Sequence, residues 1–135
     1  MYKTVSFIIF MLLHQAALAW DEQDISQLKT TKSCIGCDFT KADLRWANVY
    51  AAELGGAPNM VDANMERADF SGANLFGANL EGANLQGANF SGANLSWASL
   101  IAADFTGAEL GGAKLTGAVF CGTIMPDGTR NNKNC

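Results

Sequence analysis

Apolar and polar residues follow a five-residue period along most of the chain. From Ala63 to Gly122 the sequence divides into twelve consecutive pentads without a change of phase. A second block of four pentads runs from Cys37 to Gly56, and the irregular pentad Pro58–Asp62 follows it, with Ala57 as one extra residue between them. A period of five fits neither the roughly 3.6 residues of an α-helix nor the roughly 2.0 of a flat strand. It predicts a chain that turns a corner every five residues.

Each pentad places one large and one small apolar side chain in the same interior. The small residue is Ala two positions before the large one, except at Cys37 and Pro58. The last two residues of each pentad are predicted to point outward, and the frequent Gly at the end relieves crowding at the bend. The large residues are Phe39, Leu44, Val49, Leu54, Met60, Met65, Phe70, Leu75, Leu80, Leu85, Phe90, Leu95, Leu100, Phe105, Leu110, Leu115 and Phe120.

This pattern resembles the pentapeptide-repeat family, whose motif is Ala-(Asp/Asn)-Leu-x-x. The match covers 17 pentads, or 85 of the 135 residues. The resemblance implies an all-β solenoid over residues 37–122, a right-handed quadrilateral β-helix with four pentads in each coil, and hence about four coils. Coils stacked at the β-ladder spacing of ~4.8 Å would make the solenoid ~20 Å long.

Both ends of the repeat are predicted to be closed, because an open solenoid end exposes unpaired backbone groups. Residues 20–36 would form an N-terminal cap with a short helix over 21–29, whose acidic start and final Lys suit the helix dipole. Ile25 and Leu28 share one face of that helix. Residues 123–135 would form a turn, marked by Pro126-Asp127-Gly128, and a polar tail.

The first 19 residues have the features of a signal peptide. The apolar run Val5–Leu13 is shorter than the ~20 residues of a membrane span, and Ala17-Leu18-Ala19 offers a cleavage site. An uncleaved anchor is the alternative, which His14 and Gln15 oppose by interrupting the apolar stretch. The sequence therefore predicts an exported protein, periplasmic or secreted, without a stable membrane anchor after cleavage.

Residues 20–135 lack the groups that several kinds of chemistry need. The only His of the chain is His14, so no imidazole base or metal ligand would remain after cleavage. Eight Lys and Arg residues stand against thirteen Asp and Glu residues, a net charge of −5, and no basic stripe for nucleic acid is present. We expect no catalytic residue, no cofactor and no metal.

The four cysteines allow three interpretations. Cys34 and Cys37 could form a redox-active C-x-x-C, but Cys37 begins a pentad instead of a helix that would lower its pKa. A shared zinc site needs sulfurs within ~2.3 Å of the metal, whereas the two ends of the solenoid would lie ~19 Å apart. An even number of cysteines in an exported chain favours two structural disulfides, Cys34–Cys37 and Cys121–Cys135.

Two further sets of polar residues, the asparagines and the carboxylates of the repeat, are interpreted as parts of the fold without a chemical role. The Asn residues that precede the large residues could bind a ligand, but Asn commonly bonds the backbone at turns. Paired carboxylates could hydrolyse glycosides at separations of about 5–9 Å, but the repeat has no long loop to shape a pocket. These carboxylates are interpreted as a solvated surface: Asp43, Glu53, Asp62, Glu66, Asp69, Glu81, Asp104 and Glu109.

A possible interaction face is indicated by large apolar residues at outward positions. Stacked positions lie 20 residues apart, which sets Phe76 above Ser96 and Gly77 above Trp97, so that Gly77 would leave space for the indole. Across Ala57 the offset becomes 21, and this sets Arg45 over Glu66 and Trp46 over Arg67, as an ion pair and a cation–π contact. The predicted face consists of Phe76, Trp97, Ile101, Trp46 and Tyr50.

The leading functional prediction is a non-catalytic structural or protein-interaction module, with an unknown protein partner or self-association and no nucleic acid. The second candidate follows from the resemblance: some pentapeptide-repeat proteins imitate duplex DNA and protect topoisomerases. A solenoid of ~20 Å with charge −5 is short and weakly acidic beside a duplex carrying one charge per ~1.7 Å. The third candidate is a thiol oxidoreductase acting through Cys34 and Cys37.

Overall fold

The structure, a computed structural model, describes residues 22–135. The predicted signal peptide, residues 1–19, and the first residues of the predicted cap lie outside this range. In the described part no helix has the length and hydropathy required to cross a membrane.

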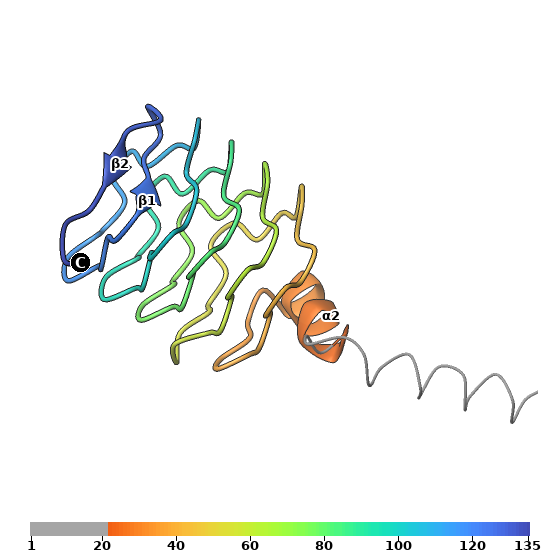
Figure 1. Cartoon of the computed structure of the whole chain (residues 1–135). Coiled ribbons are helices and arrows are strands. Elements are labelled where there is room, and N and C mark those ends of the chain that lie inside the picture. Colours follow the sequence, from red (N-terminus) through yellow and green to blue (C-terminus); the bar gives the residue numbers. More distant parts are fainter. Residues whose placement is uncertain (1–21) are drawn as a thin grey trace, which may run out of the picture.

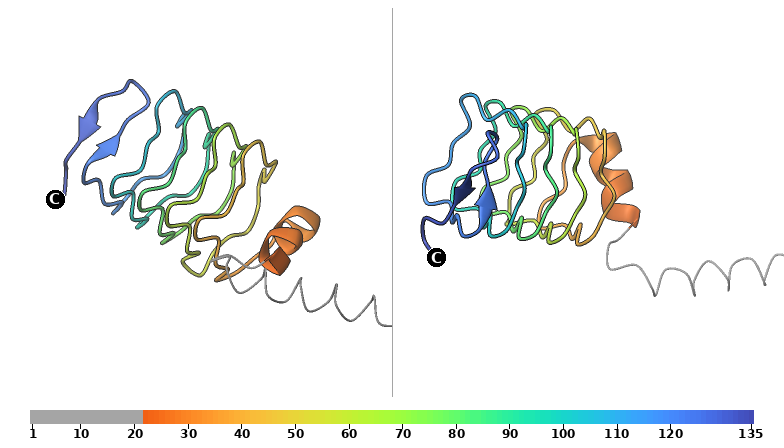
Figure 2. Two further views of the ribbon diagram at one scale, coloured as in Figure 1. Left: turned by 45° about the vertical axis from the view of Figure 1, so that its right-hand side comes forward. Right: turned by 45° about the horizontal axis from the view of Figure 1, so that its top comes forward.

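Residues 33–126 form a solenoid of stacked coils, which lie side by side between a helix at one end and the C-terminal hairpin at the other (Figures 1 and 2). Parallel backbone bridges join each pentad to the one 20 residues later, as between Asn59 and Asn79. The offset is 21 for pairs that span the region of Ala57, as between Asp38 and Asn59, which confirms one extra residue between Glu53 and Asn59, the segment that contains Ala57. An offset of 20 is four pentads per coil, and four such ladders run along the solenoid.

The bridged segment in each pentad is a single residue, so the coils contain no extended strands. The named strands of the described chain are β1 (Thr123–Ile124) and β2 (Arg130–Asn131). The chain turns again before a second residue can pair. The solenoid therefore depends on backbone hydrogen bonds between coils, such as that from the Leu75 N–H to the Asn94 carbonyl oxygen at 2.8 Å.

The interior is the one that the repeat predicts. Most of the small residues and most of the large ones are buried in one continuous core. Phe70 and Phe90 stack with ring centroids 5.1 Å apart, and Phe105 meets Phe90 edge-on at 5.6 Å. Leu110 and Leu115 are only partly buried, because the last turns of the solenoid have no further coil above them.

The corners are built by the polar residue before the large one and by the last residue of the pentad. The Asn74 side-chain oxygen accepts a hydrogen bond from the Phe76 N–H at 3.2 Å, and the same bond recurs at Asn79, Asn84, Asn89 and Asn94. The predicted role of Asn at the corners is thereby confirmed. The last residue of each pentad has positive φ, as at Gly77 with φ 70° and Trp97 with φ 62°.

Helix α2 (Glu22–Thr31) covers the first coil (Figure 1). Ile25 and Leu28 are buried against the core, so the predicted shared face is the one that packs. The coils begin four residues earlier than the sequence indicated: Ser33 pairs with Glu53, and Cys34 is fully buried at the position of a large residue. A cysteine there hid the pentad from the pattern.

The other end of the solenoid also extends beyond the predicted boundary at residue 122. Ile124 pairs with Asp104, and the carbonyl oxygen of Pro126 accepts a hydrogen bond from the Gly107 N–H at 2.9 Å. The chain then turns at residues 126–128 and returns as strand β2, antiparallel to β1. The coil and the hairpin therefore share strand β1.

Candidate functional site: one corner of the solenoid

One of the four corners carries most of the exposed apolar side chains. Backbone hydrogen bonds align it from coil to coil: the N–H of Gly36 donates to the Gly55 carbonyl, that of Gly77 to Ser96, and that of Trp97 to Thr116. We call this edge the apolar corner. It consists of Ile35–Gly36, Gly55–Ala57, Phe76–Gly77, Ser96–Trp97 and Thr116–Gly117.

Exposure separates this corner from the other three. Among residues 22–135 the exposed large hydrophobic residues are Ile35 (73%), Trp46 (67%), Tyr50 (61%), Phe76 (48%) and Trp97 (65%). Ile35, Phe76 and Trp97 lie on the apolar corner. The interior positions of their pentads are already filled by Cys34, Leu75 and Leu95, all fully buried, so the core does not require these three side chains.

Two side chains of the apolar corner, those of Ile35 and Trp97, lean toward the following coil. A Cβ placed on Gly117 would lie 2.7 Å from the Trp97 ring, and one placed on Gly56 would lie 2.9 Å from Ile35 Cγ2. The prediction that Gly77 makes room for the Trp97 indole is wrong, because the nearest side chain to a Cβ at Gly77 is that of Ala57, at 3.5 Å. The indole rests on the coil that follows it.

Trp46 has a partner within the protein. The Arg67 guanidinium carbon lies 4.9 Å from the centroid of the Trp46 ring, which confirms the predicted cation–π contact. Arg45 does not pair with Glu66 as predicted: it binds Asp43 of its own pentad at 2.7 Å, and Glu66 pairs with Arg67 at 3.7 Å. The shorter reach within one corner favours Asp43.

The remaining predicted residues lie on other corners. Tyr50 precedes Ala51, whose N–H donates to the Ser71 carbonyl oxygen, and its ring lies 3.9 Å from a Cβ placed on Gly72. Ile101 is partly exposed and accepts a hydrogen bond from the Gly82 N–H through its carbonyl oxygen. Trp46, Tyr50 and Ile101 therefore occupy three corners separate from that of Phe76 and Trp97.

Ile35 is the residue of the apolar corner that the sequence prediction missed. It lies between two cysteines, and the sequence pattern places the start of the repeat after it, at Cys37. Counting one pentad back from Phe39 makes Cys34 the large interior residue and Ile35 the outward residue. That shift of phase was the signal available in the sequence.

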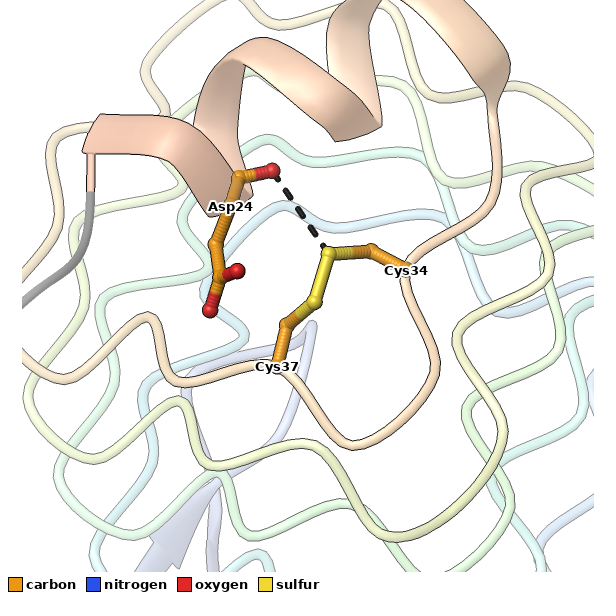
Figure 3. A group of neighbouring side chains, drawn as sticks. All are labelled: Asp24, Cys34 and Cys37. Carbon is orange, nitrogen blue, oxygen red and sulfur yellow. Dashed lines mark hydrogen bonds between the residues drawn. A yellow bond between two sulfur atoms is a disulfide. The ribbon is translucent and has the colours of Figure 1, made fainter.

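The cysteines lie at the two ends of the solenoid and are joined as Cys34–Cys37 and Cys121–Cys135. Figure 3 shows the first pair beside Asp24 of helix α2, with Cys34 Sγ 3.6 Å from the Asp24 backbone oxygen. The Asp24 carboxylate accepts a hydrogen bond from the Asp38 N–H at 3.0 Å. The arrangement ties α2, the disulfide and the first coil together, and the oxidation of both pairs in the mature protein stays a prediction.

Metal binding beside α2 would require the Cys34–Cys37 disulfide to be reduced. Asp24, Cys34 and Cys37 offer ligand atoms within 4.8 Å of one another, but a thiolate is the form of Cys that binds metals. Sulfurs that are joined to each other are not thiolates. With the disulfide formed, Asp24, Cys34 and Cys37 fit a structural cross-link and do not fit a metal centre.

Three carboxyl groups have a lowered pKa, and each accepts hydrogen bonds from the residue two positions later in the chain. Hydrogen bonds from Arg45 lower the pKa of Asp43 from 3.8 to about 2. Burial by itself would raise the pKa of Asp104, but hydrogen bonds from Thr106 and Gln86 outweigh it and lower that pKa. Hydrogen bonds from Thr129 lower the pKa of Asp127. All three groups are held more firmly ionised, which is opposite to what a general acid needs at neutral pH.

The repeat pattern, the four ladders and the corners define a known class of solenoid. The family model of pentapeptide repeats matches residues 59–92 and 103–126, in eight copies. The chain belongs to the pentapeptide-repeat proteins. No curated protein sequence matches it significantly.

Solved structures of the same family resemble this chain. A pentapeptide-repeat protein from the thylakoid lumen of Arabidopsis thaliana is 31% identical, with 68% of this chain and 64% of that chain covered and a TM-score of 0.65. HetL, involved in heterocyst differentiation regulation in the cyanobacterium Nostoc, is 33% identical, with 73% and 51% covered and a TM-score of 0.39. The chain thus spans less than two thirds of either structure. The family relationship implies a right-handed β-helix.

A fluoroquinolone resistance protein, the plasmid-mediated QnrB1, shares the repeat at a lower level. Its identity to this chain is 23%, with 62% of this chain and 60% of that chain covered and a TM-score of 0.33. A similarity of that size gives no support to a shared activity.

Proposed function

We propose that the protein is an exported, non-catalytic interaction module, and that its apolar corner binds a protein partner. The observation that carries this proposal is the alignment of Ile35, Phe76 and Trp97 on one corner, exposed and outside the core. Contiguous exposed apolar side chains are typical of interaction surfaces, and aromatic residues dominate binding energy at such surfaces.

Export is supported by three separate features. Residues 1–19 have the pattern of a signal peptide. The four cysteines form two pairs, which is typical of chains that fold in oxidising compartments. The similar Arabidopsis protein is a protein of the thylakoid lumen.

The thiol oxidoreductase hypothesis is opposed by the position of the C-x-x-C. Cys34 is fully buried and Cys37 nearly so, and α2 lies across them (Figure 3). A redox-active thiol needs to be partly exposed to meet its substrate. We expect no thiol of the exported protein to react with an alkylating reagent until it is reduced; a free Cys34 or Cys37 with disulfide-exchange activity would contradict this.

The proposal is tested by affinity capture from the exported fraction with disulfide-intact protein. The wild type is compared with Phe76→Ser/Trp97→Gly, which removes the aromatic residues of the apolar corner. Trp46→Ser is the matched control, because it removes an equally exposed indole from another corner. The proposal predicts that the corner variant loses the captured protein and the control keeps it; capture that is unchanged in the corner variant would contradict it.

A further inference from the structure

The two ends of the solenoid are closed to different extents. Helix α2 covers the first coil, whose large interior residues are all buried: Cys34, Phe39, Leu44 and Val49. At the last coil the tail covers only part of the end, because β2 pairs with β1 and Cys135 is joined to Cys121. Residues 108–112 and 113–117 are the last pentads of their ladders, and no later segment of the described chain pairs with them. We call residues 108–117 the open edge.

The open edge has backbone groups without hydrogen-bond partners. Between regular coils three hydrogen bonds join each pentad to the next coil: the N–H groups of Leu85 and Gly87 donate to it, and the Ala83 carbonyl oxygen accepts from it. The equivalent groups of the open edge have no backbone partner among residues 22–135. They are the N–H groups of Leu110, Gly112, Leu115 and Gly117 and the carbonyl oxygens of Ala108 and Ala113.

We propose that the open edge binds an extended segment of a partner protein, which adds two sides of a further coil by backbone pairing. This site lies outside the apolar corner's aromatic residues and goes beyond the proposed function. Addition of a strand to an exposed sheet edge is an established mode of peptide recognition. Leu110 and Leu115 stay partly exposed, so the segment would bury apolar surface as well as pair with the backbone.

The spacing of the unpaired groups defines the segment that fits. The same set of two N–H groups and one carbonyl oxygen recurs after five residues, so the segment consists of two consecutive pentads that turn a corner between them. Each pentad would direct one small and one large apolar residue inward, and glycine suits its last position, where the solenoid backbone has positive φ. The first coil of a second copy cannot supply this segment, because α2 covers it.

Two charges on the open edge specify the partner further. The side chains that precede the large residues contact each other from coil to coil, as the Asn74 amide donates to the Glu53 carboxylate at 3.2 Å. On the open edge these positions are Glu109 and Lys114, and both are exposed. A segment with a basic residue in its first pentad and an acidic residue in its second would pair with both. The reverse order would bring like charges together, which disfavours binding.

The chain's own last pentads supply two matched probes. A peptide of residues 113–117 followed by residues 108–112, Ala-Lys-Leu-Thr-Gly-Ala-Glu-Leu-Gly-Gly, would place its Lys over Glu109 and its Glu over Lys114. The same pentads in their natural order, Ala-Glu-Leu-Gly-Gly-Ala-Lys-Leu-Thr-Gly, would place like charges over both. The two peptides have the same composition, so a difference in their affinity reports the order of the charged pentads.

The test is a titration of the disulfide-intact chain without its first 19 residues with each peptide, followed by amide NMR. The titration extends to about 10 mM, because a free peptide loses conformational entropy when it is ordered and should bind in the millimolar range. The exchanged-order peptide should shift the amide signals of Leu110, Gly112, Leu115 and Gly117 downfield and slow their hydrogen exchange. The natural-order peptide should bind at least about 3-fold more weakly.

Exchange of the two charges provides the matched variant. Glu109→Lys/Lys114→Glu should reverse the preference between the peptides without changing the melting temperature, because both side chains are exposed. Phe76→Ser, two coils before the open edge, should leave both titrations unchanged. The absence of a saturable shift at the four amides, or a preference that the charge exchange does not reverse, would overturn this inference. Capture that depends on Phe76 and Trp97 would still support the proposed function in that case.

Discussion

From Lys41 to Arg67 the last position of the pentad holds side chains of every size, whereas from Gly72 to Gly122 it holds glycine except at Trp97 and Ala102. All of these positions have positive φ. Residues other than glycine lose roughly 1–2 kcal/mol in that conformation. The earlier non-glycine residues at this position are Lys41, Trp46, Ala51, Asp62 and Arg67, and Ala57 beside the last position of its pentad has the same conformation, with φ of 54–58° at all six.

The interiors of the two regions are alike, so the difference concerns the surface alone. In the earlier coils a corner side chain meets the next corner, as Trp46 meets Arg67, and such contacts offset part of the backbone strain. Trp97 stands among glycines, and its ring makes no cation–π or aromatic contact among residues 22–135. Strained non-glycine residues that nothing nearby explains are often associated with binding or function.

The largest expected effect tests whether the interiors are truly alike. Leu54→Ala in the earlier region and Leu85→Ala in the later one each remove a fully buried side chain, and each should lower the free energy of unfolding by ~2–5 kcal/mol. Urea melts measure both. The outward control Gln86→Ala loses one exposed hydrogen bond to Asp104 and should cost less than ~1 kcal/mol. A Gln86→Ala cost equal to that of Leu85→Ala would refute the inward and outward assignment.

The second prediction compares the two ends. Cys121–Cys135 closes a loop with a sequence separation of 14, and its removal by Cys121→Ser/Cys135→Ser should cost up to ~3 kcal/mol. After reduction of both disulfides, hydrogen exchange should increase first in residues 126–135, because α2 stays anchored by buried Ile25 and Leu28. Middle coils that exchange before either end would contradict this order.

The third prediction uses two glycines of the later region. Gly107→Ala adds a Cβ with nothing within 4 Å at φ +69°, whereas Gly117→Ala adds one 2.7 Å from the Trp97 ring at φ +73°. Gly107→Ala should cost ~1–2 kcal/mol from the backbone alone, and Gly117→Ala should cost ~1–3 kcal/mol more. In a Trp97→Gly background the two costs should become equal; a persistent difference would show that the indole does not lie on Gly117.

The smallest expected effect concerns acid. The pKa of Asp43 is lowered to about 2 by Arg45, so the stability from this carboxylate is complete above its ordinary value of 3.8 and is lost as the pH falls toward 2. Because the side chains are more than half exposed, the change in melting temperature between pH 5 and pH 2 should be below about 3 °C. Asp43→Asn should remove that part of the acid sensitivity; an unchanged pH profile would contradict the assignment.

The sequence predicted the parts of the fold that depend on the period. The five-residue pattern identified the interior, and the extra Ala57 placed Trp46 over Arg67. The number of pentads in a coil came from the family resemblance. The tilt of Trp97 was not predictable, because glycine precedes and follows it at Gly77 and Gly117 and the pattern is the same on both sides.

Two other features depended on choices that the repeat leaves open. Arg45 had acidic neighbours both in its own pentad and on the next coil, and only side-chain geometry decides for Asp43. Ile35 was hidden because Cys34 stands where the repeat normally has Leu or Phe. Without Ile35, the predicted face combined residues from different corners.

Trp97→Gly tests the central claim most directly, because it removes a side chain that the account assigns to binding and gives the backbone the residue that its φ favours. We predict that the melting temperature stays the same or rises, by the equivalent of up to ~1 kcal/mol, while affinity capture of the partner by the same sample is weakened or lost. A variant that melts lower than the wild type, or one that captures the partner as strongly, would show that the indole belongs to the packing of the solenoid and would contradict the account.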